Sequence, residues 1–335
     1  MRKKVTLALQ GGGAHGAFTW GVLDAFLADG RLDVAGISGT SVGAMNAVVY
    51  ADGLREGGPD RARMQLGEFW RAVSLDGAMT DQQRGIFDMF LGFWDPLKLR
   101  DAVTQSASTY LSPYDFNPLD INPLRDVIER LIDFKALRAS DDLKLFIAAT
   151  SVRTGKARIF HRPELTIDML MASACLPTVF KAVEIDGEPF WDGGYMGNPT
   201  LYPLYTETDC HDIILVQINP IRRDEAPRTA RAIMDRLNEI TFNAPLLQEF
   251  RAIDFVARLI DAGRLHGTHY KKVFLHLVEG GPALDRYGAD TKMQADYAFF
   301  RELFDIGHKA GKDFLEKNFE AIGVRGTLQL KEQLI

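Results

Sequence analysis

The sequence predicts an α/β fold, with a mostly parallel sheet that is covered by helices on both faces. Two observations carry this prediction. Short apolar runs with the composition of buried strands recur along the 335 residues, and segments with apolar side chains at helical spacing lie between and after them. Strands that alternate with helices in this way are typical of a parallel sheet with helices packed on its faces.

The first elements of the chain show both patterns. Residues 5–9 form a short apolar run that ends at a glycine cluster, which is typical of a fully buried parallel strand. Residues 17–28 carry large apolar side chains at helical spacing and predict a helix. Residues 34–37 predict the second strand. Residues 41–50 are small and apolar, and they predict a helix that packs closely on the sheet.

The later elements are predicted by the same patterns. Further strands are expected at residues 143–149, 157–160, 213–218 and 273–278. Further helices are expected at residues 166–173, 230–241, 246–262 and 291–317. Apolar side chains at helical spacing in the C-terminal helices indicate core or dimer packing, namely Leu246, Phe250, Ile253, Ala257 and Ile260, and Tyr297, Phe300 and Phe304.

Two stretches, residues 52–75 and 76–125, are expected to be irregular insertions. Clean periodic runs are few in both, and the second contains four prolines. The second also contains a cluster of large apolar residues at 86–94. For that cluster two interpretations stay open, packing on the core and a lid that contacts lipid.

The composition is that of an ordinary globular protein. Hydrophobic residues make up 46% of the chain and charged residues 25%, and the length allows one large domain or two smaller ones. We expect a core of residues 1–220 that includes an insertion or lid region at about 52–125. Residues 221–335 are expected to form a mainly helical extension, with one further strand that packs on the core.

Charge, cysteine usage and hydropathy exclude several classes of protein. The net charge of −6 gives no electrostatic case for nucleic acid as a partner. Cys175 and Cys210 show no CxxC or Cys/His spacing, so neither a disulfide framework nor a zinc site is expected, and their usage fits a reducing, cytoplasmic compartment. No window approaches about 18 uninterrupted apolar residues, so no membrane-spanning helix is expected.

The pattern Gly39-Thr40-Ser41-Val42-Gly43 is a G-x-S-x-G nucleophile elbow. It falls between a predicted strand and a predicted helix, which is the context that such an elbow requires. Gly39 and Gly43 remove Cβ atoms where the strand and the helix crowd each other, and the helix directs its positive N-terminal dipole at the nucleophile. Ser41 is therefore the candidate nucleophile for acyl transfer.

A second glycine cluster, Gly11-Gly12-Gly13-Ala14-His15-Gly16, follows the first predicted strand. The backbone N–H groups of such a loop at the start of a helix can bind an anion. The spacing also matches a dinucleotide fingerprint, but that site needs an acidic residue at the end of the second strand, and Asp33 stands at its start. Because the first two strands are neighbours, we expect Gly11, Gly12 and Gly13 to form an oxyanion hole near Ser41.

The motif Trp191-Asp192-Gly193-Gly194 supplies a candidate base. Glycines after a carboxylate let the backbone turn, so that the acid can approach a neighbouring strand end. We expect Asp192 to orient Ser41 and to accept its proton, with partial burial raising the pKa of the carboxyl group. A simple Asp-Gly turn is the alternative. Five histidines follow Asp192, so the chain order of a Ser–Asp–His triad is available, but none stands in a glycine-bounded loop.

These motifs together resemble those of the patatin-like phospholipase family. The marks of that family are a glycine-rich loop after the first strand, a G-x-S-x-G elbow after the next, and an Asp-Gly-Gly/Ala motif far downstream. Here they are residues 11–16, 39–43 and 192–194. A block of small residues with a proline, at 172–180, is also similar. The resemblance covers roughly residues 5–220.

The resemblance implies a three-layer α/β/α fold with additional C-terminal helices. It also implies a dyad, with Ser41 as the nucleophile and Asp192 as the base, that works without a catalytic histidine, a metal or another cofactor. Members of the family often carry arginine where this chain has His15. That difference is expected to leave the charge of the glycine loop pH-dependent.

The activity that this resemblance implies is hydrolysis of carboxylic esters of phospholipids or lysophospholipids through an acyl-enzyme. An acyltransferase, a thioesterase or a polyester depolymerase with the same dyad is one alternative, and a non-catalytic lipid-binding protein is another. The expected partners are a lipid or acyl-ester substrate and, transiently, a membrane surface. The C-terminal helices could also support a homodimer.

Overall fold

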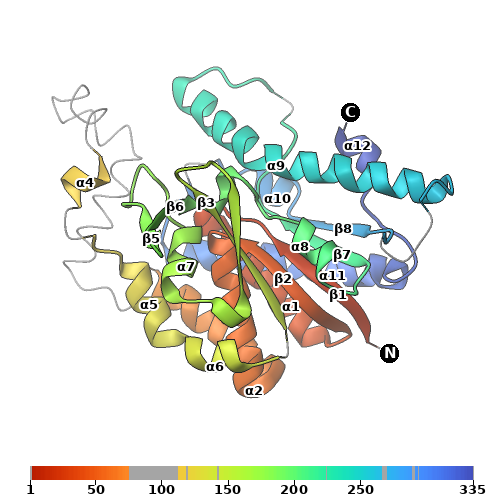
Figure 1. The fold of residues 1–335 in the computed structure, drawn as a ribbon, viewed down its shortest axis with the longest axis horizontal. Helices are drawn as coiled ribbons and strands as arrows, with labels where there is room; N and C mark the ends of the chain where they lie inside the picture. The colour runs from red at the N-terminus through yellow and green to blue at the C-terminus, as the bar shows by residue number, and fades with distance from the viewer. Residues whose placement is uncertain are drawn as a thin grey trace.

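The computed structural model describes residues 2–74, 112–117, 120–141, 143–223, 225–265, 270–288, 291–292 and 294–334 (Figure 1). The strands in these ranges are β1 (Lys3–Leu9), β2 (Leu32–Thr40), β3 (Lys144–Ser151), β4 (Ala157–His161), β5 (Val183–Ile185), β6 (Glu188–Asp192), β7 (Asp212–Gln217) and β8 (Phe274–Glu279). The helices are α1 (Gly16–Asp29), α2 (Val42–Ala72), α4 (Pro113–Phe116), α5 (Pro123–Leu131), α6 (Phe134–Ala139), α7 (Ile167–Ser173), α8 (Tyr202–Thr206), α9 (Ala230–Asp261), α10 (Pro282–Asp285), α11 (Tyr297–Asn318) and α12 (Leu330–Leu334).

The strands form one mixed sheet in the order β5-β6-β3-β2-β1-β7-β8, and β4 also pairs with β3. The pairs β1–β2, β2–β3, β1–β7 and β7–β8 are parallel. The pairs β3–β4, β3–β6 and β5–β6 are antiparallel. The predicted mostly parallel sheet is therefore confirmed, while the hairpin of β5 and β6 adds an antiparallel edge that the sequence analysis did not predict.

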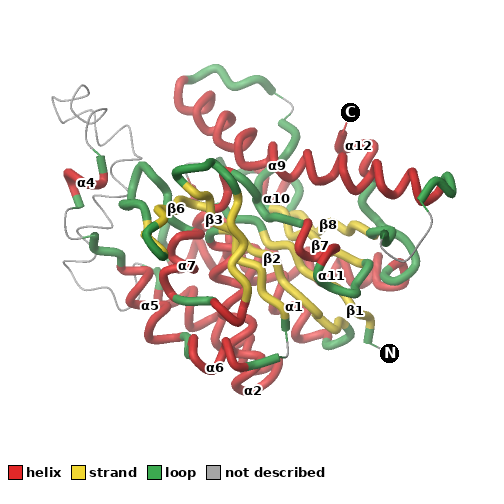
Figure 2. Tube along the Cα trace, viewed as in Figure 1, coloured by secondary structure: helices red, strands yellow, loops and turns green. Residues whose placement is uncertain are grey.

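Helices cover both faces of this sheet (Figures 1 and 2). Side chains along β1 point alternately to the two faces of the sheet, as the buried residues Leu7, Ala8 and Leu9 illustrate. Leu7 and Leu9 belong to the larger core cluster, which also contains side chains of α1, α2 and α11, whereas Ala8 belongs to a second cluster with side chains of α8 and α9. The layers are thus helix, sheet and helix, as the resemblance implies.

The C-terminal part of the chain contributes to both the sheet and one helix layer. Strand β8 pairs with β7 along its whole length. Helix α11 packs closely along α1, where a Cβ atom on Gly21 or on Gly307 would collide with the backbone of the facing helix. The division of the chain at residue 220 into a core and an extension stays a prediction.

Residues 52–75 are not the irregular insertion that the sequence analysis predicts. Helix α2 runs through them to Ala72, with non-helical backbone only at Gly57 and Gly58, just before Pro59. Beyond this break the helix buries Leu66, Phe69 and Trp70 at helical spacing. Gly57, Gly58 and Pro59 interrupt the helical pattern of the sequence, but the structure has a helical segment on each side of this break.

Other boundaries also differ from the prediction. The helices expected at residues 230–241 and 246–262 are one helix, α9, which continues through Pro245. The helix expected to start at residue 291 begins at Tyr297. The apolar cluster at residues 86–94 lies outside the described residues. Within the described ranges, no helix is both long enough and apolar enough to cross a membrane.

Candidate active site

Ser41 stands on a sharp turn between the end of β2 and the start of α2. Its backbone has φ +55° and ψ −126°. Residues other than glycine rarely adopt this conformation, which costs on the order of 1–3 kcal/mol. A Cβ atom on Gly39 would lie 2.6 Å from the carbonyl oxygen of Gly43, and one on Gly43 would collide with the carbonyl of Leu9. Both glycines are therefore needed for the turn that projects Ser41.

The glycine loop after β1 lies directly against this turn. Leu9 pairs with Gly39 in the parallel register of β1 and β2, so the loop that follows Leu9 meets the elbow. A Cβ atom on Gly11 would lie 2.7 Å from the Cβ atom of Ser41. The neighbourhood of the two motifs thus follows from the pairing of the first two strands.

The three glycines of the loop differ in what their N–H groups bind. The N–H of Gly11 donates to Oδ1 of Asn198 at 2.6 Å. The N–H groups of Gly12 and Gly13 donate no hydrogen bond to another described residue. Two adjacent unpaired donors beside a serine hydroxyl suit a developing oxyanion. Gly11 has a different task, since its N–H anchors the loop.

Asp192 comes to the elbow from the antiparallel side of the sheet. In the strand register Thr40 pairs with Ala148 of β3, and Asp192 pairs with the next residue, Ala149. Because β4 occupies the other edge of β3, β2 and β6 follow each other along one edge, and Ser41 and Asp192 lie next to each other on the same side of β3. The end of α7 and the segment that follows it connect them further, because Ser41 N–H donates to Ser173 Oγ at 3.0 Å and Asp192 N–H donates to the carbonyl of Cys175 at 2.7 Å.

The carboxylate of Asp192 is buried, with 1% of the residue exposed. Its Oδ1 accepts a hydrogen bond from Gly194 N–H at 2.7 Å, while Oδ2 has no hydrogen-bond partner among the described residues. Burial raises the pKa of Asp192 to about 7, and the Gly194 N–H and the nearby Ser41 hydroxyl oppose that rise. The Ser41 hydroxyl is thus close to the carboxylate but does not reach hydrogen-bonding geometry with it, as is common for catalytic groups without substrate.

Several residues around the site escaped the sequence analysis. Asn198 and Asn219 both hold the loop, since the Asn219 side chain donates to the carbonyl of Gly11 at 2.7 Å. Gln10 accepts hydrogen bonds from the backbone N–H groups of Ile218 and Asn219. Asn219 follows β7 at the carboxyl end of a parallel strand, which is where ligand-binding residues gather in such sheets. That position was a signal that could have identified it.

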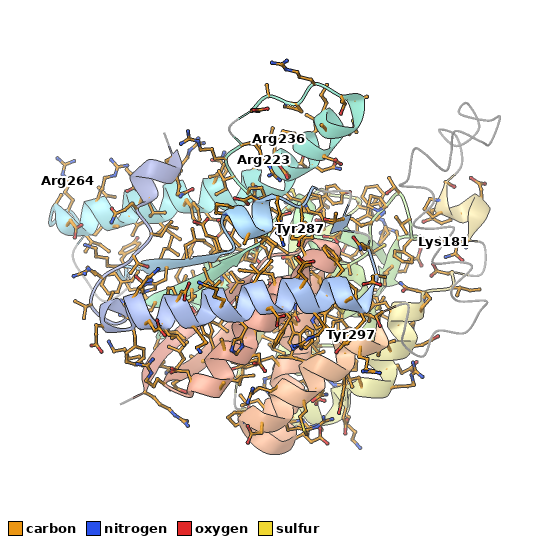
Figure 3. The ribbon with its side chains drawn as sticks, turned by 180° about the vertical axis from the view of Figure 1, so that it is seen from behind. Lys181, Arg223, Arg236, Arg264, Tyr287 and Tyr297 are labelled. Atoms are coloured by element: carbon orange, nitrogen blue, oxygen red, sulfur yellow. The ribbon has the colours of Figure 1, made fainter. Side chains whose placement is uncertain are left out.

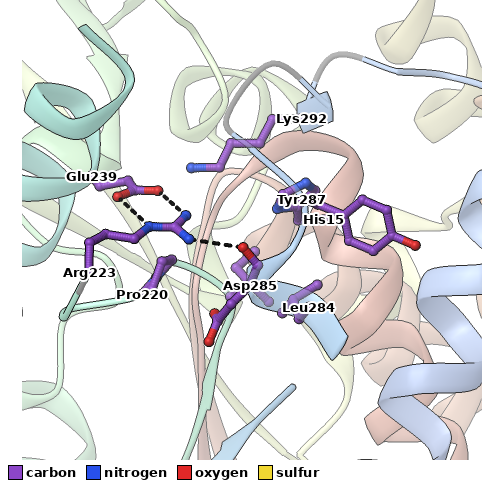
Figure 4. A pocket seen from close by; sticks show the side chains of 9 residues that line it. His15, Pro220, Arg223, Glu239, Leu284, Asp285, Tyr287 and Lys292 are labelled. Carbon is purple, nitrogen blue, oxygen red and sulfur yellow. Dashed lines mark hydrogen bonds and ion pairs between the residues drawn. The ribbon is translucent and has the colours of Figure 1, made fainter. Parts of the chain in front are cut away.

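His15 is buried and does not give the loop a pH-dependent charge. Burial is the main cause that lowers the pKa of His15 to about 3, and the neighbouring cations of Lys292 and Arg223 lower it further. Its Nε2 lies 2.7 Å from Oγ1 of Thr291. The expectation of a titrating loop is therefore wrong, because the ring stays neutral around pH 7. The positive charges beside the loop belong to Lys292 and Arg223, which line a small pocket with His15 (Figure 4).

No histidine in the described part of the chain is hydrogen-bonded to Ser41 or Asp192. The buried His276 bonds instead through Nε2 to Asp212 Oδ1 at 2.9 Å, where β7 begins. That position is at the opposite end of the strands from the elbow, which follows the carboxyl end of β2. His266 and His269 lie outside the described residues.

Curated relatives of this sequence include fungal lysophospholipases. One from Aspergillus terreus is 25% identical over 341 residues, and one from Coccidioides immitis is 25% identical over 350 residues. Each alignment takes in 99% of this chain and 19% of the relative. The chain therefore spans about a fifth of the length of these relatives.

Two solved structures show a weak overall likeness. VipD from Legionella pneumophila has a TM-score of 0.34 and 16% identity, over 91% of this chain and 67% of that one. ExoU of Pseudomonas aeruginosa, solved in complex with SpcU, has a TM-score of 0.30 and 14% identity, over 99% of this chain and 77% of the matched one.

The sequence model of the patatin-like phospholipase family matches residues 7–205, which is more than half of the chain. The match begins in β1 and ends in α8, so it includes the glycine loop, the elbow and the turn at Asp192. The resemblance drawn from the motifs is thereby confirmed. The chain belongs to the patatin-like phospholipase family of ester hydrolases.

Proposed function

We propose that this protein is a serine lipid acyl hydrolase that cleaves carboxylic esters of phospholipids or lysophospholipids with Ser41 and Asp192 as a dyad. One observation carries the proposal. A serine on a strained elbow stands beside a buried carboxylate, and one carboxylate oxygen and two nearby backbone N–H groups have no hydrogen-bond partner among the described residues. The family match and the lysophospholipase names of the fungal relatives support the lipid substrate. Release of fatty acid from a defined lysophospholipid, compared between wild type and Ser41→Ala, tests it.

In this mechanism Asp192 takes the proton of Ser41 while Oγ attacks the ester carbonyl. The negative oxygen of the tetrahedral intermediate accepts hydrogen bonds from the N–H groups of Gly12 and Gly13. One such donor typically contributes about 2.7–4 kcal/mol to lowering the barrier. Asp192 then returns its proton to the leaving alcohol, which leaves an acyl-enzyme. Water, deprotonated by Asp192, attacks the acyl-enzyme and releases the fatty acid and free Ser41.

The pH profile is expected to report Asp192. A general base must be deprotonated, and the pKa of Asp192 is raised to about 7. We therefore expect kcat/KM for a soluble p-nitrophenyl ester to fall about tenfold per pH unit below pH 7 and to approach its maximum as the pH rises past 7. Stopped assays from pH 5 to 7.5 measure this. A profile that stays flat down to pH 5 would mean that the base ionises like an ordinary surface aspartate.

We also propose that the outward face of α9 meets the lipid surface that holds the substrate. Ile233, Leu237 and Ile240 share one side of the N-terminal half of this helix, because they are four and three residues apart. Glu239 of the same half is buried instead, and it pairs with Arg236 and with Arg223, which lie close together (Figure 3). Exposed fractions are 43% for Ile233, 57% for Met234, 49% for Leu237 and 50% for Ile240.

The position of this apolar face and its small area favour contact with lipid over contact with a second copy of the protein. Phe242, on the same helix, packs on the ring of Tyr195 with ring centroids 5.3 Å apart, and a Cβ atom on Gly194 would collide with it. The apolar face is thus next to the turn that holds Asp192. Four half-exposed side chains fall well short of the ~800 Å² that each partner of a stable protein complex buries.

The double variant Leu237→Asp/Ile240→Asp is expected to bind phosphatidylcholine vesicles at least tenfold more weakly, because two apolar side chains lose their burial in lipid. Its turnover of a soluble short-chain ester should stay at the wild-type value. Vesicle sedimentation and the soluble assay measure the two. Met64→Asp, at a 59% exposed methionine on α2, is the matched control. Equal vesicle binding by both variants, or a wild-type dimer that the double variant dissolves, would contradict the lipid assignment.

The cytoplasm is the compartment that we infer. Cys175 and Cys210 are both buried and both free thiols. Free cysteines of this kind are usual in a reducing compartment. Contact with a membrane would then be peripheral, through the outward face of α9.

A further inference from the structure

A chain of hydrogen bonds leads from a lysine to the back of the glycine loop. Nζ of Lys292 donates to Oδ1 of Asn219 at 2.7 Å, and Nδ2 of Asn219 donates to the carbonyl oxygen of Gly11 at 2.7 Å. Asn198 adds a longer contact of 3.4 Å to the same carbonyl. The carbonyl of Gly11 and the N–H of Gly12 belong to one peptide unit. The lysine is therefore connected, through one side chain, to a backbone donor that faces the proposed oxyanion.

We propose that Lys292 and Asn219 are positioning residues that polarise the Gly11–Gly12 peptide and so strengthen the Gly12 N–H as an oxyanion donor. The physical basis is the resonance of the amide. A hydrogen bond to the carbonyl oxygen draws electron density from nitrogen to oxygen, which makes the N–H of the same peptide more positive. A charged donor at the head of the chain enlarges the effect. This inference rests on the proposed function.

The surroundings of Lys292 leave its charge available for this task. Among the ion pairs of the described residues none contains Lys292, while Glu239 of α9, which also lines the pocket, is already paired with Arg223 and Arg236. His15, on the loop itself, is neutral around pH 7. Lys292, Glu239, Arg223 and His15 line one small pocket beside the loop (Figure 4). The lysine thus supplies a positive charge beside the glycine loop.

The lysine is also held in a fixed position relative to the loop. Gly13 has φ +57°, and a Cβ atom there would collide with the backbone carbonyl of Lys292. Asn219 is 1% exposed, and its Nδ2 also lies 3.2 Å from Oε1 of Gln10. The relay therefore joins two segments, after β7 and before α11, to the loop after β1. Side chains that only hold the loop in place would make the same contacts, so the test must distinguish structural support of the loop from polarisation of the Gly11–Gly12 peptide.

The protonation of Lys292 gives one such readout. Burial lowers the pKa of Lys292 to about 8; Glu239 and Asp235 of α9 oppose this shift, and Arg223 adds to it. His15 of the loop and Asp285 and Tyr287 beyond β8 also face the pocket. As the pH rises through about 8 the ammonium loses its charge, so wild-type kcat should fall on the alkaline side. Lys292→Arg, which keeps its charge, should lack that alkaline fall.

The experiment measures kcat and KM of wild type, Lys292→Met, Asn219→Ala and the double variant with a soluble ester. Each single variant is expected to lower kcat about tenfold, the size of one charge-assisted hydrogen bond, with KM within twofold. The double variant should lose no more than either single one, because both break the same chain. An unchanged kcat in either single variant, or losses that multiply in the double variant, would overturn the relay.

Two controls keep this test separate from folding and from the proposed function. If Lys292→Met lowers the Tm strongly, two other variants test the relay. Lys292→Arg tests it by whether kcat still falls at alkaline pH, and Asn219→Ala tests it by the value of kcat. Labelling by a fluorophosphonate probe monitors Ser41. A wild type that the probe does not label counts against the proposed function itself, whereas normal labelling with wild-type kcat in Lys292→Met counts against the relay alone.

Discussion

Ser41→Ala is expected to lower kcat for ester hydrolysis by about 10⁴–10⁶-fold, because the acyl-enzyme cannot form without the hydroxyl. The Tm should change little, since alanine keeps the Cβ atom of the elbow and the backbone N–H that donates to Ser173. Turnover of p-nitrophenyl esters of increasing chain length measures the loss. Labelling by a fluorophosphonate probe should vanish in the same variant.

A matched serine controls for the probe and for the substitution. Ser140→Ala removes a hydroxyl at the end of α6 that donates to the carbonyl of Leu137, far along the chain from the elbow. This variant should label and turn over like wild type. If instead Ser41→Ala retained labelling, the nucleophile would be a different residue.

Asp192→Asn is expected to lose activity on a similar scale while it stabilises the fold at alkaline pH. The amide cannot accept the proton of Ser41, so kcat should fall by about 10⁴-fold or more. The pKa of Asp192 is about 7 in the folded protein, above its value in an unfolded chain. A carboxyl group whose pKa rises on folding destabilises the fold when it is ionised, by about 1.4 kcal/mol for each pH unit that separates its folded and unfolded pKa values.

This destabilisation by Asp192 depends on pH. For wild type, it is complete above pH 7 and disappears as the pH falls toward about 4, where the carboxyl group is neutral in both states. Asp192→Asn should therefore raise the Tm at pH 8 and change it little at pH 4.5. Asp186→Asn, at an exposed aspartate between β5 and β6, is the control and should show no such difference. A lower Tm for Asp192→Asn at pH 8 would contradict a destabilising, ionised carboxylate.

The sequence predicts the parts of the site that lie next to one another along the chain or in the parallel sheet. Buried strands are short apolar runs, so β1 and β2 can be read directly, and their pairing brings the glycine loop to Ser41. Asp192 could be identified as a candidate because two glycines follow it. Its position beside Ser41 depends on how β3 pairs with β2 and with β6, and no local sequence pattern encodes that pairing.

The features that sequence analysis missed depend on contacts between distant segments. Asn198 meets Gly11 across 187 residues, and Asn219 meets it across 208 residues. Lys292 reaches Asn219 from a segment for which the sequence predicts the start of a helix, although that helix begins only at Tyr297. Likewise, a helical apolar pattern in α9 shows which side chains share a face, but only the fold shows that Ile233 and Leu237 are exposed.

Fatty-acid release from a lysophospholipid, measured in parallel for wild type, Ser41→Ala and Asp192→Asn, shows whether Ser41 and Asp192 hydrolyse a lipid ester. We expect release of one fatty acid per glycerophosphoester in wild type and background release in both variants, all three proteins being folded. Fatty-acid release by Ser41→Ala at the wild-type rate would contradict this expectation.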